Sequence, residues 1–536
     1  MTLGENGIFT KVQYAKEQYE MAAVKEKLNL AMLEIQTEEI NNGELTLDTM
    51  LIKLQEKLPG ITIAKDGETL KGTLDGYDFT IDENFNVTID GYNEEAGNGG
   101  SQEPEITTYT VTLNGSNVTS NGANTVEENA SYTTTLTAAE GYKIATVEVK
   151  MGETTLTGGT HYTYENGTIT IASVTGNLTI TVTAYQTVAS QKTSATTADV
   201  YYASEKTLID SSGNIVKVPA GFKVAQDSGI NVTEGIVIED NDIVTGKGNN
   251  RGNQYVWIPV GEDIKKENQD GTITTVDITL GRYRFATEGE VVNGTTLTKG
   301  TPILVQNIND YTNKSSAIQI TGYNSRLFYE DIEQRAGVAS ADTNGRNATA
   351  LSILNFKNSV ASKHGYYIAR YEASYGATDG KANSKVSNSA GTSVPTTEGT
   401  LWNNITQINA AIASRDLYNN GVTSDLTNSY AWDTAIVYIQ AFSNDTVYSY
   451  QTSINTGSAP SNTGENTDEV CKINDMASNV TEWTTEYCAY STGSYAYPCT
   501  GRGGGYAYSS YCTSYRIYTN ATNSIFSIAF RPTLYW

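Results

Sequence analysis

Reactive thiols are scarce in this sequence, and most of them lie near its C-terminal end. The chain has four cysteines, of which Cys488, Cys499 and Cys512 fall in the segment 487–518, while Cys471 precedes it. Four cysteines allow three complete pairings, between which a sequence cannot choose. One or two disulfides of an exported protein are one interpretation, and free thiols are the other. We favour free thiols.

The same segment holds nine tyrosines, where the average of 36 in 536 residues would give about two. It has almost no Leu, Ile or Val, so it does not resemble an ordinary core. Tyrosine offers a large, rigid contact area with a polar tip, and Ser, Gly and Asn adapt around it, as in antibody paratopes. The alternative is a tyrosine-rich sheet, since aromatic residues suit strands. We predict a binding face made by Tyr495, Tyr497, Tyr506, Tyr508, Ser510, Tyr511, Cys512, Ser514, Tyr515, Tyr518 and Asn520.

Composition excludes several other kinds of chemistry. Histidine, the usual general base and metal ligand, occurs only as His161 and His364. The chain has 35 Lys and Arg against 60 Asp and Glu, a net charge of −25, which argues against binding to nucleic acid or to an anionic membrane. No run of 18 apolar residues is present, so we expect no membrane span in the given chain, and its start shows no signal peptide.

The elements that position the tyrosines belong to a multidomain α+β chain of three or four domains. Apolar residues every three or four positions predict a long helix over 8–40, and a shorter helix follows over 46–58. Alternating residues then predict strands at 61–63, 77–81 and 86–89. Residues 1–92 thus form a helix with a small antiparallel sheet, and the polar residues 93–104 form a linker.

The rest of the chain is predicted to contain two further domains. Residues 105–185 are all strand and turn, with turn signals every 8–15 residues, which is typical of an immunoglobulin-like β-sandwich. A second polar stretch, 186–198, reads as a linker. The largest unit, 199–536, mixes short strands with two expected helices, 351–362 and 432–442.

The first 92 residues resemble a type IV pilin-like protein of Gram-positive bacteria. The resemblance rests on the opening GENGIF (4–9), on the long helix directly after it and on the small sheet that follows. In that family a hydrophobic arm, cleaved by a prepilin peptidase, precedes this sequence. The resemblance implies an exported protein at the cell surface or on a pilus, whose hydrophobic arm is missing from this chain.

The last domain is similar to the formylglycine-generating family, which has a C-type-lectin-like fold. The similarity rests on six short motifs that occur in a fixed order. They are YVWIPV (255–260), GYYIARYE (365–372), AWDTA (431–435), NDMASNVTEWT (474–484), RGGGY (502–506) and FRP (530–532).

That family includes oxidases that hold copper with two closely spaced cysteines after the arginine–glycine motif, because Cu(I) prefers soft thiolate ligands. Here Cys512 matches the second position, but the first falls near Tyr506 or Tyr508, which cannot replace a thiolate. The remaining candidate, Cys499, precedes Arg502. We therefore predict no enzyme and no cofactor, and an oxidase with an atypical site at Cys512 and Cys499 is the alternative.

The motif residues Glu482, Trp483, Arg502 and Arg531 are interpreted as scaffold. We expect Glu482 to pair with one of the two arginines and to fix the C-terminal strand, because a carboxylate–guanidinium pair is geometrically strict. An ordinary exposed Glu beside a core Trp is the competing interpretation. Oxygen atoms of Asp475 and Asn479 are weak candidates for Ca²⁺ ligands. A polar turn before a strand explains these two residues better.

The tyrosine-rich end also resembles the variable proteins of diversity-generating retroelements, which use a C-type-lectin-like fold with a variable C-terminal region. In that system adenine-directed mutagenesis converts asparagine codons into codons for Tyr, Ser, Cys and similar residues, the set found at about 487–527. The resemblance implies a surface adhesin or receptor-binding protein that binds a protein or surface ligand of unknown identity, without catalysis. A structural pilus subunit that contacts other pilins is the remaining alternative.

Overall fold

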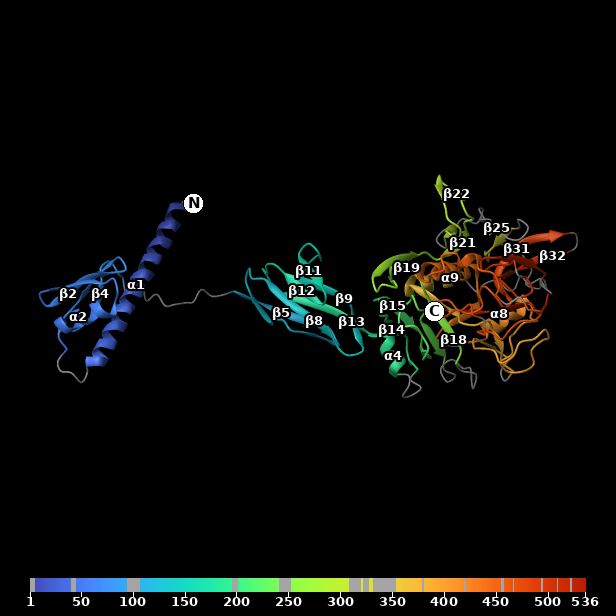
Figure 1. Cartoon of the computed structure of the whole chain (residues 1–536), viewed down its shortest axis with the longest axis horizontal. Helices are drawn as coiled ribbons and strands as arrows, with labels where there is room; N and C mark the ends of the chain where they lie inside the picture. The colour runs from blue at the N-terminus through green and yellow to red at the C-terminus, as the bar shows by residue number, and fades with distance from the viewer. Residues whose placement is uncertain are drawn as a thin grey trace. The chain divides into compact units, whose positions relative to one another are not determined.

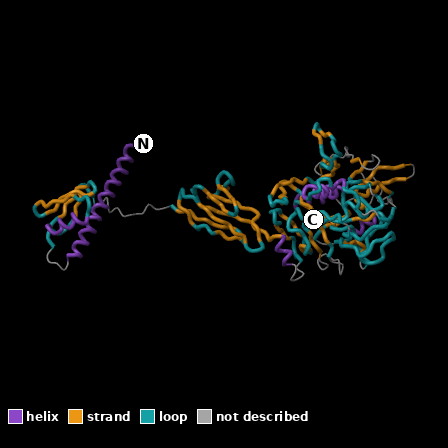
Figure 2. Tube along the Cα trace, in the orientation of Figure 1, coloured by secondary structure: helices purple, strands orange, loops and turns teal. Residues whose placement is uncertain are grey.

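The computed structural model describes residues 5–39, 45–93, 107–194, 201–240, 252–307, 320–321, 327–330, 353–377, 380–418, 421–454, 457–465, 467–492, 495–508, 510–520 and 523–536. The chain is α+β and multidomain (Figures 1 and 2), and it divides into two compact units, Met1–Thr108 and Tyr109–Trp536. None of the helices in these ranges is both long and apolar enough to cross a membrane.

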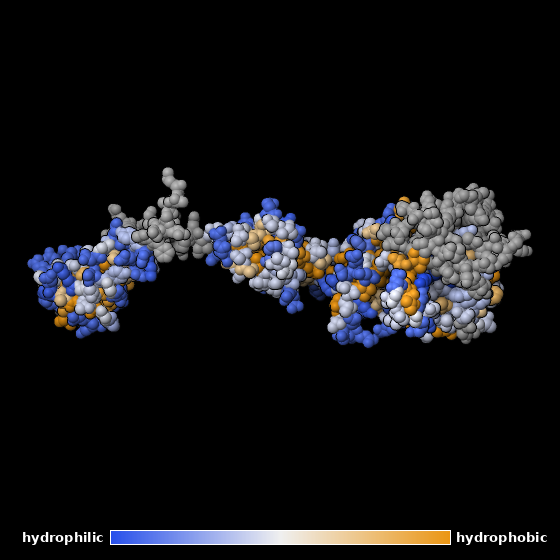
Figure 3. Space-filling view, turned by 90° about the horizontal axis from the view of Figure 1, so that it is seen from above, coloured by the Kyte–Doolittle hydropathy of each residue, from blue (hydrophilic) through white to orange (hydrophobic). Residues whose placement is uncertain are grey.

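The first unit packs two helices on a small sheet. Helix α1 (Glu5–Glu39) and helix α2 (Leu47–Lys57) agree with the helices predicted at 8–40 and 46–58. The Thr46 side chain caps α2 by accepting the Thr49 amide at 3.3 Å. Both helices bury apolar side chains such as Leu28, Ile35 and Leu54 against the sheet, while the visible outer face is mostly hydrophilic (Figure 3).

The sheet of this unit is antiparallel, in the order β1-β2-β3-β4. Three of its strands lie where the alternation predicted them, and β2 is an addition. The run TLKGTL of β2 contains Lys71 and Gly72, and glycine is disfavoured in strands, so the pattern did not mark a strand. The strands are β1 (Thr62–Asp66), β2 (Thr69–Leu74), β3 (Tyr77–Ile81) and β4 (Val87–Ile89).

The segment from 107 to 187 forms two facing sheets, as the regular turn signals predicted. One sheet has the order β11-β12-β8-β6, and the other contains β10-β9-β13, with β5 on β13 and β7 on β5. Side chains such as Val149, Ile169 and Ile180 fill the space between them. The strands are β5 (Thr108–Asn114), β6 (Val118–Ser120), β7 (Thr125–Glu127), β8 (Tyr132–Ala138), β9 (Tyr142–Met151), β10 (Thr154–Thr155), β11 (Tyr162–Glu165), β12 (Thr168–Ile171) and β13 (Leu178–Thr187).

The linker expected at 186–198 is structured over its described part, 186–194. Strand β13 continues to Thr187 and helix α4 (Val188–Ser194) follows it. The end of β13 pairs in parallel with β14 (Lys206–Ile209), and Val188 is fully buried in the core of the last domain. The polar composition was misleading because hydrogen bonds to β14 and one apolar anchor order this stretch. The sandwich and the last domain therefore share a sheet and form one unit.

The last domain is built around a six-stranded sheet in the order β16-β17-β18-β27-β35-β30. A second sheet has the order β25-β26-β31-β32-β33, and β34 pairs with β31 in parallel. Helix α9 (Ser429–Phe442) lies against both sheets and is buried around almost its whole circumference. Helices α7 (Ile353–Lys363) and α9 correspond to the two predicted helices, and α8 (Gln407–Arg415) is an addition.

The C-terminal residues return to the centre of this domain, because β35 lies between β27 and β30. The strands of the domain are β15 (Ile215–Val218), β16 (Phe222–Val224), β17 (Val237–Asp240), β18 (Gln254–Pro259), β19 (Gly261–Glu267), β20 (Ile273–Ile278), β21 (Gly281–Phe285), β22 (Val291–Val292), β23 (Thr295–Thr296), β24 (Pro302–Asn307), β25 (Ile320–Thr321), β26 (Leu327–Tyr329), β27 (Gly365–Ala369), β28 (Ser374–Tyr375), β29 (Ala382–Asn383), β30 (Thr423–Leu426), β31 (Thr481–Thr492), β32 (Tyr495–Arg502), β33 (Arg516–Thr519), β34 (Ile528–Phe530) and β35 (Pro532–Tyr535), with one 3₁₀ turn at Tyr448–Tyr450.

Candidate functional site

The tyrosine-rich segment forms β32, a loop over 503–515, and β33. The loop starts with three glycines that approach the backbone of the preceding motif very closely. A Cβ atom at Gly504 would lie 2.0 Å from the Ala477 carbonyl oxygen, and Gly503 has a φ of +82°. Only glycine tolerates such a close backbone contact and such a positive φ without strain, so these residues allow the loop to pack directly on the segment 476–480.

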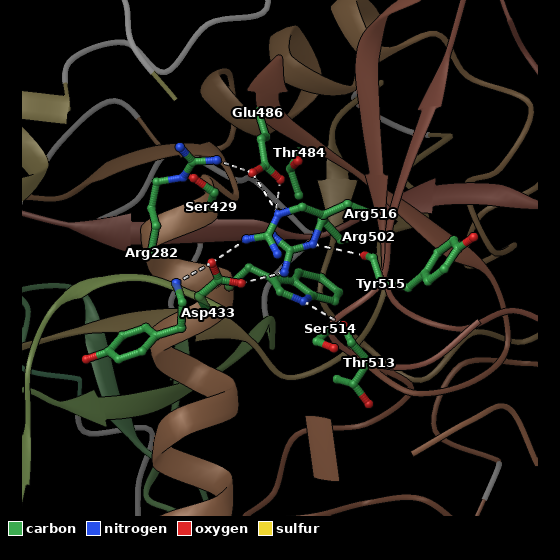
Figure 4. Close-up of polar contacts among 12 residues, drawn as sticks. Arg282, Ser429, Asp433, Thr484, Glu486, Arg502, Thr513, Ser514, Tyr515 and Arg516 are labelled. Atoms are coloured by element: carbon green, nitrogen blue, oxygen red, sulfur yellow. Dashed lines mark hydrogen bonds and ion pairs between the residues drawn. The ribbon is translucent and has the colours of Figure 1, made fainter. Parts of the chain in front are cut away.

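Beneath the loop lies a buried cluster of five charged side chains, which we call the ion network. It consists of Arg282, Asp433, Glu486, Arg502 and Arg516, which come from β21, α9, β31, β32 and β33 (Figure 4). Each of the five is at most 3% exposed. Five elements are therefore joined at one point through charged side chains that water does not reach.

The two carboxylates of the ion network lie between the three guanidinium groups. Asp433 accepts one bond from Arg502 at 2.5 Å and another from Arg516. Glu486 accepts from Arg282 at 2.5 Å, from Arg516 at 2.9 Å and from Arg502 at 3.2 Å. Buried charges are stable only when they are paired and hydrogen-bonded, and this geometry meets that condition.

The electrostatics of the network are dominated by the arginines. Burial by itself raises the pKa of Glu486, but the attraction of Arg516, Arg502 and Arg282 outweighs this effect and lowers the pKa to about 2. Glu486 is therefore ionised at every pH at which the protein is expected to work. Glu486 is thus a fixed negative charge rather than a proton donor.

The network also supports the loop through its backbone. Arg502 Nε donates to the Tyr515 carbonyl at 3.1 Å, and Trp432 Nε1 donates to the Thr513 carbonyl at 3.0 Å. Figure 4 shows the Tyr515 ring directed away from the network, while its carbonyl faces Arg502. The guanidinium carbon of Arg502 lies 5.7 Å from the Trp432 ring centre, within range of a cation–π contact.

A second buried ion pair confirms the pairing predicted for Glu482. Arg531 Nε donates to the two carboxylate oxygens at 2.9 and 2.7 Å, and its Nη2 donates at 2.5 Å. Arg531 also donates to the Ala369 and Asn474 carbonyls at 3.0 and 2.8 Å. Glu482 is 1% exposed, so the interpretation as an ordinary exposed glutamate is wrong. Trp483 is buried and donates to the Ile405 carbonyl at 2.9 Å.

Three of the predicted face residues form a column of parallel rings, which we call the tyrosine stack. The centres of the Tyr508 and Tyr511 rings are 4.7 Å apart at an interplanar angle of 16°. Those of Tyr511 and Tyr515 are 4.1 Å apart at 17°. Tyr508 is 39% exposed, Tyr511 is 8% exposed and Tyr515 is partly buried. The middle ring of the stack is thus the most buried, and the stack is joined to the ion network through the Tyr515 carbonyl, not through a ring.

Tyr506 does not lie on the exposed face, contrary to the prediction. Its side chain is 5% exposed and packs with Leu401, Val480 and Ala529, and its ring centre is 6.4 Å from that of Phe526. Its amide donates to the Asn479 carbonyl at 2.8 Å. A tyrosine ring is mostly apolar, so it can fill a core position as well as a binding surface, and the sequence does not distinguish the two. Tyr511 is likewise buried, because its ring lies between two others.

The remaining predicted face residues lie at intermediate depth. Ser510 is exposed, while Cys512, Ser514, Tyr518 and Asn520 are partly buried. Thr513 and Ser514 donate backbone bonds to the Gln451 and Ser449 carbonyls at 3.0 and 3.1 Å. Tyr495 and Tyr497 belong to β32, and their side chains lie outside the part that the structure describes.

The cysteines are distributed differently from the expectation of a surface cluster. Cys488 and Cys499 are buried in β31 and β32. Cys512 lies on the loop, where its backbone forms an isolated antiparallel β-bridge with the backbone of Thr452. Cys499 lies opposite Tyr487 in the sheet, so Cys488, the next residue along β31, points to the other face of the sheet. Cys471 and Cys512 are free thiols in the structure.

Asp475 and Asn479 lie in a tight polar turn, both with positive φ. Asp475 accepts the Gly464 amide at 2.6 Å, and Asn479 accepts the Ser461 amide at 2.8 Å and donates to Glu372. These bonds explain the two residues as turn-forming. Within the described ranges no group of three or more His, Cys, Asp and Glu side chains has the arrangement of a metal site.

The sequence reasoning did not identify Arg282, Asp433 and Glu486 as parts of a cluster. One signal was present: Glu482 and Glu486 are four residues apart in the strand β31, which also contains the buried Trp483. Asp433 similarly stands in an otherwise apolar helix. A charge in a buried element requires a partner, although the sequence does not say which one.

Comparison with known proteins adds little. No family model matches the chain, and no curated protein matches it. Among solved structures, the crystal structure of CarF matches with 15% sequence identity and a TM-score of 0.24, over 32% of this chain and 87% of that chain. At that TM-score the likeness carries no argument about fold or function.

Proposed function

We propose that this protein is a surface-displayed binding protein whose loop 503–515 contacts a ligand without transforming it. The observation that carries the proposal is the tyrosine stack, with an exposed ring at its outer end and the ion network beneath it. Aromatic anchors on a rigid support provide most of the affinity in many interfaces. The rings are already ordered, so binding costs little conformational entropy.

The division between fixed and changeable positions supports a variable surface of the retroelement type. Arg502 and Arg516 are bound on several sides by the ion network, and Gly504 has no room for a side chain. Tyr508 and Ser510, in contrast, are exposed and can be replaced without breaking these contacts. We propose that substitutions gather at such exposed positions of about 487–527. Sequencing the locus in sister isolates tests this, and substitutions spread evenly over the domain would contradict it.

The finer assignments belong to the same proposal. We propose a pilin-like base for 1–92, an immunoglobulin-like spacer for 105–185 and a C-type-lectin-like display domain for 199–536, with the protein at the cell surface or on a pilus. The long α1 on a small sheet, the two facing sheets and the returning C-terminal strand support these assignments in turn.

A peptide selection tests the binding function. A phage-displayed library of short random peptides is selected on the full chain, and clones are then compared on the wild type and on the double variant Tyr508→Ser, Tyr518→Ser. We expect enriched clones to lose at least about tenfold in affinity on the double variant. The control is Tyr164→Ser in the sandwich, since Tyr164 has the same 39% exposure as Tyr508. Clones that bind all three proteins equally would exclude the loop as the binding surface.

A further inference from the structure

The outer ring of the tyrosine stack has one covered face and one open face. The Tyr508 ring lies nearly parallel to the Tyr511 ring, at 16° and with centres 4.7 Å apart, so Tyr511 covers its inner face. Tyr511 is 8% exposed, whereas Tyr508 is 39% exposed. The ring face of Tyr508 that points away from the stack is not covered by Tyr511, and we call it the open face.

This open face is held in place before any ligand arrives. The Tyr511 amide donates to the Tyr508 carbonyl at 2.9 Å, and the Tyr515 amide donates to the Cys512 carbonyl at 2.8 Å. These two turns fix the spacing of the three rings along the loop. A ligand that stacks on Tyr508 meets an ordered surface, which reduces the entropic cost of binding.

The net charge of the whole chain attracts cations. No charged side chain occurs in the loop from Gly503 to Tyr515, while the chain as a whole has a net charge of −25. The two arginines that flank the loop, Arg502 and Arg516, are buried in the ion network and are bound to Asp433 and Glu486. A positive group that approaches Tyr508 is attracted over distance and meets no exposed cation in the loop.

The face of a tyrosine ring carries partial negative charge and attracts cations placed over it. A guanidinium group is planar and weakly hydrated, so it can lie flat on such a ring, whereas an ammonium group is compact and strongly hydrated. We propose that the open face of Tyr508 binds the guanidinium group of an arginine presented by a partner protein. This inference rests on the proposed binding function and names the partner chemistry for its outer ring.

The test compares three labelled peptides of equal length on the full chain: alternating Gly–Arg, Gly–Lys and Gly–citrulline. Citrulline is flat like arginine but uncharged. We expect the arginine peptide to bind about 2- to 30-fold more tightly than the lysine peptide, and the citrulline peptide to bind more weakly than both. Fluorescence anisotropy at physiological salt measures the three affinities.

Variants locate the effect. Tyr508→Leu should remove the preference for arginine over lysine, Tyr508→Phe should keep it because the ring face remains, and Tyr164→Leu should leave it unchanged. An arginine peptide that binds Y508L as tightly as the wild type, or a citrulline peptide that equals the arginine peptide, overturns the inference. If Y508L fails to fold, Tyr508→Ser takes its place, and the lysine peptide controls for general attraction to the net charge of −25.

The two proposals fail in different ways. Selected library clones that need the loop but contain no arginine would refute the arginine inference and leave the binding function intact. Clones enriched in aromatic residues would identify an aromatic side chain as the occupant of Tyr508 and refute the inference in the same way. Clones that do not need the loop would refute the binding function itself.

Discussion

Replacing Glu486 with Gln should destabilise the last domain strongly, because it removes one of the two carboxylates that hold three buried arginines. The pKa of Glu486 falls from 4.5 to about 2. At about 1.4 kcal/mol for each pKa unit, this difference corresponds to about 3 kcal/mol of stabilisation. Removal of one partner from a buried ion pair costs about 3–5 kcal/mol, which agrees in size. We therefore expect E486Q to lose about 3 kcal/mol of unfolding free energy at pH 7.

Urea unfolding followed by tryptophan fluorescence measures this loss of unfolding free energy in the last domain. All five tryptophans lie in the last domain, so their emission reports that domain alone. The pKa of Glu486 is lowered, so its contribution is complete above pH 4.5 and disappears as the pH falls toward 2. The wild type should therefore lose stability over this range, and E486Q should lose less.

A matched control separates the ion network from ordinary surface pairs. Glu290 makes a single ion pair with Arg284 at 2.5 Å in the same domain, and both side chains are partly exposed. We expect Glu290→Gln to shift the unfolding midpoint much less than E486Q, because exposed pairs contribute little. A loss below about 1 kcal/mol in E486Q, or an equal loss in both variants, would refute the view that the network holds the five elements together.

Three further predictions concern other buried groups and the domain junction. Burial, reinforced by Asp475 and Glu482, raises the pKa of Glu372 well above 4.5, so the folded protein keeps a proton that the unfolded chain loses. Stability should fall as the pH rises above 4.5, by up to about 1.4 kcal/mol per pH unit, and urea titrations should show a flatter profile in Glu372→Gln. Glu482→Gln should lower stability by about 3 kcal/mol in the same assay, since it leaves Arg531 buried without its carboxylate, and an unchanged melting temperature would contradict this. A chain that begins at residue 199 lacks the β13–β14 pairing and the buried Val188. Calorimetry should therefore show a lower melting temperature for this chain than for the chain 107–536. Equal melting temperatures would show that the shared sheet does not stabilise the last domain.

Local patterns were sufficient for elements that carry their own signal. The spacing of apolar residues predicted α1 and α9, and strict alternation predicted β3 at Tyr77–Ile81. Where order depends on distant contacts, the patterns failed. Residues 186–194 look like a polar linker, yet they are ordered by β14, which lies more than ten residues further along the chain.

The candidate site likewise contains one contact that the sequence predicted and others that it did not. Glu482 could be paired in advance with one of two arginines, Arg502 or Arg531, because all three stand in recognisable motifs and their chemistry is complementary, and the structure shows that the partner is Arg531. The partners of Asp433 and Glu486 come from strands far apart in the chain, and no local pattern joins them. Tyr506 and Tyr508 are chemically identical and two residues apart, yet one is 5% and the other 39% exposed, a difference that only the packing of Leu401 and Val480 decides.

The parallel pairing of β5 with β13 has a mechanical consequence. Val111 to Asn114 lie in register with Leu178 to Thr181, and the chain enters the sandwich through β5 and leaves it through β13 toward the last domain. Tension between the first unit and a captured ligand therefore pulls these strands along their length in opposite directions. The hydrogen bonds between them are loaded together in shear instead of breaking one after another. For the surface-displayed binding protein proposed above, this pairing would let the chain resist drag while its ligand stays bound.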